Sequence, residues 1–497
     1  MTKRRILTYV GYCGFGLKGS QIQSTIAPEY TIEGIIAKRL FNHHLLKENN
    51  YLNPEHLRLD RSTRTDKGVH SLANFISLKV ESAVNRSDEK ATESFADSIQ
   101  QMINSKSENE QVPLTMNNYQ QVQQFPDSNL KAFRVEVISR RVNTRSLVVI
   151  RGYEYILPFQ IILNLVKQFD SSPQKEDKIL DLLRLKIANE DIYQLEEEKK
   201  TSLLLQVICE KLNYILNQFE GYHSFHNFTL PSASNDGEPI LRQIYHCFAS
   251  PTRVKCDNNH EEWAIRIKLS GNGFLQHQIR KMISSALLHI IAPEIMNQEF
   301  LDIALKSNEE IFVSKVPGEH LIHTRSILYD LEMEKRFSSC REQQITFKKT
   351  ILYPKIFKEY RSVLEEHWDK YAREVESFGN EWLSKKEQVK NRALENIETQ
   401  RLLTLQRQEK DAKFRQDLLS QKKLFPVRAL PNGYRSHFYV KFKLYPHDER
   451  AIKTLSTLEA MILSQKLAVS SSFELLDQVV VSEKLLNPSE IQIDEEL

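Results

Sequence analysis

One polar loop carries the side chains best suited to chemistry. The segment Arg61-Ser-Thr-Arg64-Thr-Asp66-Lys67-Gly68-Val-His70 places a carboxylate between two cations and shortly before a glycine. Neighbouring cations favour the ionised form of a carboxyl group, and such a group can act as a nucleophile or a base where water is excluded. Gly68 permits backbone conformations that a Cβ atom would penalise. The same residues are also typical of an ordinary capped turn with surface ion pairs, so composition alone leaves both interpretations open.

Further segments add weight to the chemical interpretation. The loop resembles the central Arg-Thr-Asp-x-Gly-Val motif of the TruA-type tRNA pseudouridine synthases, and its Lys67 resembles the eukaryotic Pus1-like branch. Other segments resemble that family's motifs in the same order: Tyr12-x-Gly14-x-Gly16-x-x-Gly19-x-Gln21, Thr31-Ile-Glu33, Arg151-Gly-Tyr153-Glu-Tyr155, residues 219–229, residues 273–282, Val316-Pro317-Gly318 and residues 347–354. The resemblance covers about residues 5–358.

The resemblance implies a set of site residues. Asp66 would be the catalytic aspartate of an isomerisation in which the N1–C1′ bond of uridine breaks and the base rejoins through C5. Arg64 would help hold the flipped nucleotide, Tyr153 would stack on the target base, and Arg280 would pair with Asp66. We also expect Gln21 to line the site. The target base must leave its stack to reach the pocket. No metal and no cofactor are expected.

The residue types support parts of this set independently. Arg280 lies on an otherwise apolar helix, where burying it without a partner would be costly. Asp66 is the simplest candidate for an acidic partner. Tyr153 and Tyr155 share one strand, so we expect one of the two to belong to the core. Lys281, next to Arg280, is expected to reach RNA phosphate or solvent.

The elements that must position these side chains are strands and amphipathic helices. Residues 5–10, 76–80 and 262–269 are predicted strands, and residues 274–291 are a predicted buried helix. Strands and helices are interspersed without a βαβ rhythm, which favours the α+β class. The resemblance implies the pseudouridine synthase fold, with two sheet-containing halves flanking a central RNA-binding cleft, plus a long helical C-terminal extension.

Composition along the chain predicts four regions. The N-terminal catalytic half would span 1–160, with a polar insertion at about 81–129, and the C-terminal catalytic half would span 161–358. Residues 359–425 would form a long charged helical segment, because glycine and proline are nearly absent and charges are dense there. Residues 426–497 would form a small strand and helix extension with a loose tail. We expect the long segment to be solvated, with a partner-binding or RNA-touching helix as the alternative.

Overall composition bounds the class of protein. The chain has 497 residues, 40% of them hydrophobic, with 68 Lys and Arg against 65 Asp and Glu, which is enough apolar material to exclude wholesale disorder. Its five cysteines are too scattered for a disulfide framework, and Cys256 with His260 could be at most half of a zinc site. No apolar run is long enough to span a bilayer. We expect an intracellular protein, in the nucleus first, with the mitochondrion as the alternative.

The leading functional prediction is therefore a tRNA pseudouridine synthase, an isomerase. Other structured RNAs are further candidate substrates, and the C-terminal helices are a candidate site for a protein partner. The alternative is a catalytically inactive RNA-binding or assembly subunit derived from this family, motivated by a shortened element at residues 141–150 and by the unusual tail. A carboxylate-based nuclease would want several acidic metal ligands, whereas Asp66 sits among cations.

Overall fold

The computed structural model describes residues 2–85, 88–105, 129–170, 177–186, 196–230, 240–256, 260–307, 309–360 and 364–420. Contacts divide the chain into a unit of Met1–Leu402 and a unit of Leu403–Leu497, and the strands and the candidate site belong to the first. The strand and helix predicted within 426–497 lie outside the described residues. Among the residues that are described, none of the helices is long and apolar enough to cross a membrane.

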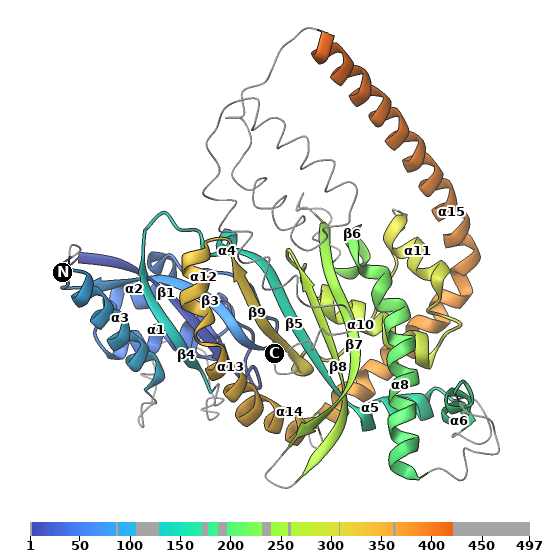
Figure 1. The fold of residues 1–497 in the computed structure, drawn as a ribbon, viewed down its shortest axis with the longest axis horizontal. Coiled ribbons are helices and arrows are strands. Elements are labelled where there is room, and N and C mark those ends of the chain that lie inside the picture. Colours follow the sequence, from blue (N-terminus) through green and yellow to red (C-terminus); the bar gives the residue numbers. More distant parts are fainter. Residues whose placement is uncertain are drawn as a thin grey trace, which may run out of the picture. The chain divides into compact units, whose positions relative to one another are not determined.

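The strands of the described ranges form one mixed sheet (Figure 1). Their spatial order is β4-β1-β3-β9-β5-β8-β7-β6, with the short β2 paired to β3. The bounds are β1 (Thr2–Tyr12), β2 (Asp60–Arg61), β3 (His70–Ser82), β4 (Lys131–Ile138), β5 (Val148–Pro158), β6 (Gly221–Ser224), β7 (Leu241–Lys255), β8 (Glu261–Gly271) and β9 (Leu321–Leu328). Neighbouring strands are antiparallel except β3 and β9, which are parallel.

The parallel contact joins the two predicted halves. His70 of β3 pairs with Ile322 of β9, and Ser71 pairs with His323. Strand β9 comes late in the chain but lies between β3 and β5. The predicted α+β class and the pseudouridine synthase fold are confirmed, and the two halves share a continuous sheet rather than two separate ones. The predicted boundary at residue 160 stays a prediction.

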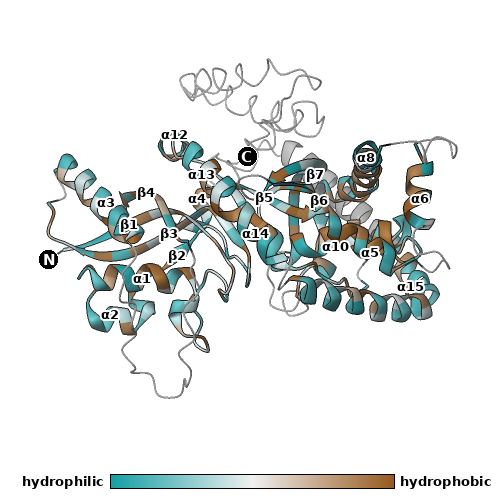
Figure 2. Cartoon of the chain, turned by 90° about the horizontal axis from the view of Figure 1, so that it is seen from below, coloured by the Kyte–Doolittle hydropathy of each residue, from teal (hydrophilic) through white to brown (hydrophobic). Residues whose placement is uncertain are grey.

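Helices pack on this sheet and beside it. Their bounds are α1 (Ile32–Asn42), α2 (Glu48–Leu52), α3 (Glu89–Asn104), α4 (Thr144–Leu147), α5 (Phe159–Gln168), α6 (Asp177–Arg184), α8 (Glu197–Leu216), α10 (Gln278–Ile291), α11 (Gln298–Lys306), α12 (Leu331–Ser338), α13 (Arg341–Phe347), α14 (Tyr353–Glu359) and α15 (Glu365–Ser420). Short 3-10 turns η1 (Pro28–Tyr30), η2 (Pro54–Leu57), η3 (Asn217–Phe219), η4 (His226–Phe228) and η5 (Gly318–His320), and a π-helical turn η6 (Lys348–Leu352), connect them. In Figure 2, α5 and α10 are largely brown, as expected for helices with buried faces.

Local sequence explains the first helix and the strand it covers. The Thr31 side chain accepts a hydrogen bond from the Gly34 backbone N–H and so caps α1. Ile32, Ile36 and Leu40 follow at helical spacing and are fully buried. They pack in one core cluster with Ile76, Leu78 and Val80, the alternating apolar residues of β3.

Part of the predicted polar insertion at 81–129 is ordered. Strand β3 continues to Ser82, and α3 begins after Asp88, whose side chain accepts a hydrogen bond from the Ala91 N–H. Ala96, Ile99 and Ile103 are buried on one face of α3. Residues 106–128 of the stretch lie outside the described residues. The predicted polar insertion therefore includes the helix α3, because these three apolar residues at helical spacing suffice to dock a helix that is otherwise polar.

The long charged segment is helical as predicted, but its first half is not solvated all round. Trp368, Tyr371, Val375, Phe378 and Trp382 of α15 are at most 5% exposed and belong to the core cluster that includes α10 and α11. Their spacing of three and four residues places them on one helix face. The dense charges that surround this apolar stripe concealed it in the sequence. The expectation of a wholly solvated helix is therefore wrong for the described side chains up to Trp382.

Candidate active site

The Arg-Thr-Asp loop is held by the glycine-punctuated loop after β1. The Ser20 hydroxyl accepts a hydrogen bond from the Thr65 backbone N–H at 3.0 Å, and the Ser20 N–H donates to the Thr65 carbonyl at 3.2 Å. The Tyr12 hydroxyl lies 2.9 Å from the Thr65 hydroxyl. Gly19 has φ +113°, and a Cβ there would lie 2.8 Å from the Thr65 carbonyl oxygen. Two motifs that are separate in sequence therefore form one rigid assembly.

A tight turn follows the candidate aspartate. The Val69 N–H donates to the Asp66 carbonyl at 3.1 Å, and Gly68 has φ +82°, a conformation that side chains disfavour. His70 is fully buried and accepts from the Gly14 N–H at 2.9 Å, so its Nε2–H donates to the Glu319 carbonyl at 2.8 Å. Burial lowers the pKa of His70 to about 4, which keeps it neutral at pH 7. The turn is thereby tied to the segment after Pro317.

The structure brings Asp66 and Arg280 together. The Arg280 Nη1 atom lies 3.7 Å from Asp66 Oδ2, and the two side chains are 13% and 22% exposed. Arg280 projects from the first turn of α10, and its Nε–H donates to the Val316 carbonyl at 2.7 Å. This hydrogen bond fixes the guanidinium, because the planar group has few remaining orientations once Nε is engaged. The pairing inferred from an arginine on an apolar helix is thus present in the fold.

His277 is a further neighbour of Asp66. Its Nε2 lies 3.6 Å from Asp66 Oδ2, and its Nδ1 lies 3.4 Å from the Lys315 ammonium. Burial lowers the pKa of His277 to about 4, and the cations Lys315 and Arg280 oppose the raising effect of Asp66. At neutral pH, Arg280 is therefore the charged partner of the carboxylate and His277 is a neutral one.

No role was predicted for His277 from sequence, although it stands three residues before Arg280 in the same motif. It occupies the N-cap position of α10 with φ +65°. The i, i+3 spacing of His277 and Arg280 was the signal that could have placed both on the same side of the helix start.

Tyr153 lies under the site on β5. It is 6% exposed, and its hydroxyl is 2.9 Å from the Thr63 hydroxyl in the Arg-Thr-Asp loop. Its ring makes an edge contact with Phe274 at a centroid distance of 5.1 Å and a tilted contact with His323 at 4.9 Å. Burial raises the pKa of Tyr153, and the nearby Asp66 charge acts in the same direction. Tyr155 is fully buried and donates to the Pro317 carbonyl. Both tyrosines belong to the same core cluster, so burial alone does not separate a core tyrosine from a site tyrosine.

Arg64 and Gln21 lie at the edge of this group. Arg64 is exposed, two residues before Asp66. Burial raises the pKa of Glu33 at the start of α1, whereas the charges of Arg61 and Arg64 lower it, which places Arg64 near that carboxylate. Gln21 is half-buried and directly precedes Ile22, whose N–H donates to Glu33 at 3.0 Å. The roles of Arg64 and Gln21 toward RNA stay predictions.

The expectation for Lys281 is wrong. The side chain is 9% exposed and its ammonium donates to the Asn227 carbonyl at 3.0 Å and to the Thr229 carbonyl at 2.8 Å. Burial lowers its pKa to about 8. Because the helix turns Lys281 toward the 221–229 segment, it anchors that segment instead of reaching RNA phosphate.

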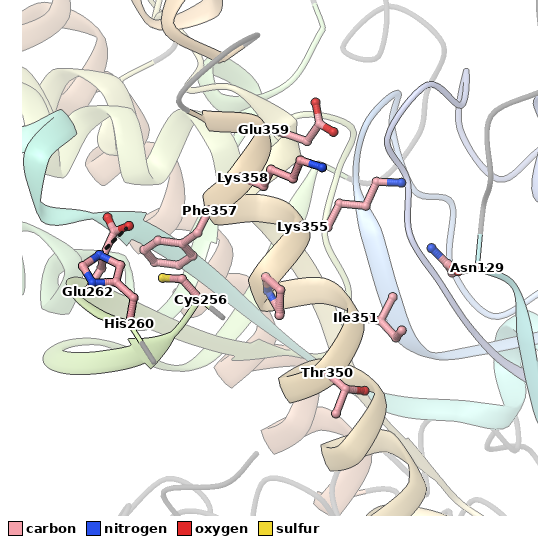
Figure 3. A pocket seen from close by; sticks show the side chains of 11 residues that line it. Asn129, Cys256, His260, Glu262, Thr350, Ile351, Lys355, Phe357, Lys358 and Glu359 are labelled. Carbon is pink, nitrogen blue, oxygen red and sulfur yellow. Dashed lines mark ion pairs between the residues drawn. The ribbon is translucent and has the colours of Figure 1, made fainter. Parts of the chain in front are cut away.

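The cavity drawn in Figure 3 lies elsewhere. It has a volume of about 510 Å³ and is bounded by α14 and the hairpin of β7 and β8, and none of the predicted site residues lines it. His260 forms an ion pair with Glu262, and the Cys256 N–H donates to the His260 carbonyl, as in an ordinary hairpin. Within the described part of the chain, no group of three or more His, Cys, Asp and Glu residues could hold a metal ion.

Comparison with known proteins shows which proteins this chain resembles. Residues 215–326 match the family model of tRNA pseudouridine synthases, a range that includes Arg280, Lys281 and the 221–229 segment. The tRNA pseudouridine synthase 1 of Yarrowia lipolytica is 25% identical, with 72% of this chain and 71% of that protein covered. The tRNA pseudouridine synthase 2 of Schizosaccharomyces pombe is 25% identical, and the alignment covers 72% of this chain and 86% of that protein. The tRNA pseudouridine(27/28) synthase of Saccharomyces cerevisiae is 23% identical, and the alignment covers 68% of this chain and 92% of that protein. The chain is therefore similar to the tRNA pseudouridine synthases of fungi over 68–72% of its length, and residues 215–326 match the model of that family, in agreement with the TruA-type, Pus1-like resemblance of its motifs.

Proposed function

We propose that this protein isomerises uridine to pseudouridine in tRNA, with Asp66 as the catalytic aspartate. The reaction class follows from the family and from the relatives' names. The role of Asp66 is supported by one observation above all, a carboxylate that is 22% exposed and lies 3.7 Å from a guanidinium on a distant helix.

The surrounding groups fit this role. The Arg280 guanidinium, fixed by the Val316 carbonyl, attracts the Asp66 carboxylate and limits its orientations. Tyr153 lies next to the loop but is only 6% exposed, so a flipped base would stack on its ring, with about 1–3 kcal/mol of stabilisation, once a neighbour such as Phe274 has moved aside. Arg64 is exposed two residues before Asp66, and we propose that it occupies the space that the flipped nucleotide leaves.

Two chemical routes use this arrangement. In the first, the Asp66 carboxylate attacks C1′ as the N1–C1′ bond breaks. In the second, it removes a proton from the sugar, and a glycal-type species forms. In both, the base then rotates and C5 bonds to C1′. In the first route the bond between Asp66 and C1′ breaks as the new bond forms, and in the second route the proton taken from the sugar returns to it. The C5 proton leaves to solvent and N1 regains a proton. The atoms and electrons therefore balance without an oxidant or a reductant.

Loss of the C5 hydrogen gives a direct test. The full chain is incubated with tRNA that carries tritium at C5 of uridine, in the presence of a chelator, and label released to water is counted. Wild type should release tritium, and Asp66→Asn should reduce the release to background while tRNA binding persists. Asp97→Asn, which removes an exposed carboxylate on α3, is the matched control and should behave as wild type.

Other outcomes would replace the proposal. If wild type binds tRNA but releases no tritium from any RNA offered, the inactive RNA-binding subunit becomes the better account. RNA cleavage that requires a divalent ion would favour a nuclease. Full activity of Asp66→Asn would leave the family assignment intact and remove Asp66 from its role.

We extend the proposal to further substrates, to the location in the cell and to a protein partner. We propose other structured RNAs as additional substrates, the nucleus as the main location, and the exposed face of α15 as a contact surface for a protein partner. A site-resolved pseudouridine map of cellular RNA with and without the protein tests the first point. A fluorescent fusion in living cells tests the second, and crosslinking from exposed positions on α15 tests the third.

A further inference from the structure

A second group of cations lies on the same sheet, far from the candidate aspartate. It consists of Lys3, Arg5, Arg58, Lys79 and Arg140, which we call the far basic cluster. Arg5 of β1 pairs directly with Lys79 of β3, and Lys3 lies two residues before Arg5. Arg58 precedes β2, and Arg140 follows the end of β4, which pairs with β1 through Arg5 and Ile138.

The cluster is anchored by its backbone and by a few polar contacts. An Arg140 Nη2–H donates to the Lys3 carbonyl at 2.9 Å. Arg5 donates to the Ser77 hydroxyl from Nε at 3.2 Å and from Nη2 at 2.8 Å, and it pairs with Asp60 at 3.6 Å. Arg58 has φ +48°, so its position is set by a turn that an arginine does not favour. The side chains of Arg5 and Arg140 are therefore fixed by hydrogen bonds, whereas Lys3, Arg58 and Lys79 are brought near them by the course of the backbone.

Little negative charge faces these cations. Asp60 is engaged by Arg5 and by the Thr144 N–H, which donates to it at 2.7 Å. Glu81, opposite Lys3 in the β1–β3 register, is only 5% exposed. Among the described residues, no carboxylate lies within 4 Å of the cationic atoms of Lys3, Arg58 or Lys79.

The mutual repulsion of these cations is visible at Lys79. Its pKa is lowered, first by partial burial and then by Arg58, Lys3, Arg140 and Arg5 together. Bringing like charges this close costs stability unless a polyanion neutralises them. Scattered surface lysines, by contrast, would not converge on one side chain from three separate segments of the chain.

The length of strand β3 gives the distance between the far basic cluster and the candidate active site. Asp66 lies just before the His70 end of β3, and Lys79 lies nine residues further along the strand, which corresponds to roughly 30 Å at about 3.3 Å per residue. A DNA duplex rises ~3.4 Å per step, and an A-form RNA duplex rises less, so an RNA stem needs at least about nine steps to span 30 Å. A stem of that length could contact both places at once.

We propose that the far basic cluster binds the phosphate backbone of a helical part of the substrate RNA, at least about nine steps from the target uridine. This inference rests on the proposed function. Three of the five residues are arginines, whose guanidinium groups bind phosphate in a bidentate manner. The cluster positions the RNA and carries no information on base sequence, because backbone contacts fix register without reading bases.

The test compares two double variants of the full chain that each remove two positive charges. Arg58→Gln with Lys79→Gln alters the far basic cluster. The matched control is Lys199→Gln with Lys306→Gln, which alters one exposed lysine on α8 and one on α11. Lys199 pairs with Glu196, just before α8, and Lys306 pairs with Asp302 within α11. Affinity for a tRNA transcript is measured against salt concentration, and thermal melting checks that both variants fold.

The salt dependence gives the expected result. Each lost phosphate contact should reduce the slope of log K against log salt by about 1, so the cluster variant should lose about 2 from its slope and the control should lose none. A short stem-loop of fewer than about eight base pairs that carries the target uridine should bind both variants equally. Such a stem is too short to reach the cluster.

Three results would overturn the inference. The first is a salt slope on full tRNA that is the same for the cluster variant and wild type. The second is a control variant whose slope falls as much as that of the cluster variant. The third is a cluster variant whose slope falls as much on the short stem-loop as on full tRNA. Failure of the proposed function is a separate result, because it appears as absence of tritium release from wild type, whereas the slopes are measured without catalysis.

Discussion

Replacing Lys348 by methionine should strongly destabilise the sheet behind the candidate site. Lys348 and Glu154 are each 1% exposed, and the ammonium lies 3.2 Å from the carboxylate. Tyr353 also donates a hydrogen bond to Glu154. Burial would raise the pKa of Glu154, but Lys348, Tyr353 and Arg266 overcome that effect and lower it. Lys348→Met therefore leaves a buried carboxylate without its main cation.

The magnitude follows from the burial of both partners. Removing one member of a buried ion pair costs about 3–5 kcal/mol, because the remaining charge is left in a medium of low polarity. In the variant, burial would raise the folded-state pKa of Glu154 above the unfolded value of about 4.5, so folding would favour the protonated form. The stability loss should then grow with pH above about 4.5, by up to 1.36 kcal/mol per pH unit, until the folded-state pKa is passed.

Urea unfolding at pH 5 and pH 8 measures this effect. Lys348→Met should lose about 3–5 kcal/mol at pH 8 and clearly less at pH 5. The neighbouring Lys349→Met makes the same chemical change at an exposed position and should change stability little. Adding Glu154→Gln to Lys348→Met should restore most of the loss, since no buried charge remains. A loss below about 1 kcal/mol, or one independent of pH, would refute the reasoning.

Three further predictions concern the site and its support. Arg280→Gln should lower tritium release about 10²-fold while tRNA affinity changes only a few-fold, because Asp66 loses the guanidinium 3.7 Å away. Gly68→Ala should cost about 1–3 kcal/mol in urea unfolding and reduce activity, because φ is +82° there, whereas Gly273→Ala, whose nearest neighbour atom would lie 3.9 Å away, should be tolerated. His323 is fully buried, and burial lowers its pKa to about 3. The free energy of unfolding should therefore fall as pH drops below about 6.5. His323→Gln should reduce the slope of unfolding free energy against pH by about 1.36 kcal/mol per pH unit between pH 6 and pH 4.

Each of these three has a contradicting outcome. Wild-type release rates for Arg280→Gln would mean that the ion pair is structural. Equal stability of the two glycine variants would mean that the turn tolerates a side chain. An unchanged acid slope for His323→Gln would mean that this imidazole is already protonated in the folded protein.

The sequence by itself determined the local elements and the order of the motifs. Alternation in β3 and helical spacing in α1 follow from the periodicity of apolar residues, and these elements pack on each other as that periodicity requires. An arginine on an apolar helix demands a buried or half-buried partner, and this argument supported the pairing of Arg280 with Asp66 that the family resemblance implied. Family motifs supplied the identity of the loop that carries the aspartate.

Only the tertiary structure decided which distant groups meet. The orientation of α10 on the sheet places His277 beside Asp66 and buries Lys281. The position of β9 determines its parallel pairing with β3. The apolar stripe of α15 and the convergence of the far basic cluster were equally hidden, because neither belongs to a continuous segment of unusual composition. Periodicity specifies which face of an element is buried, but the packing of several elements together determines what that face contacts.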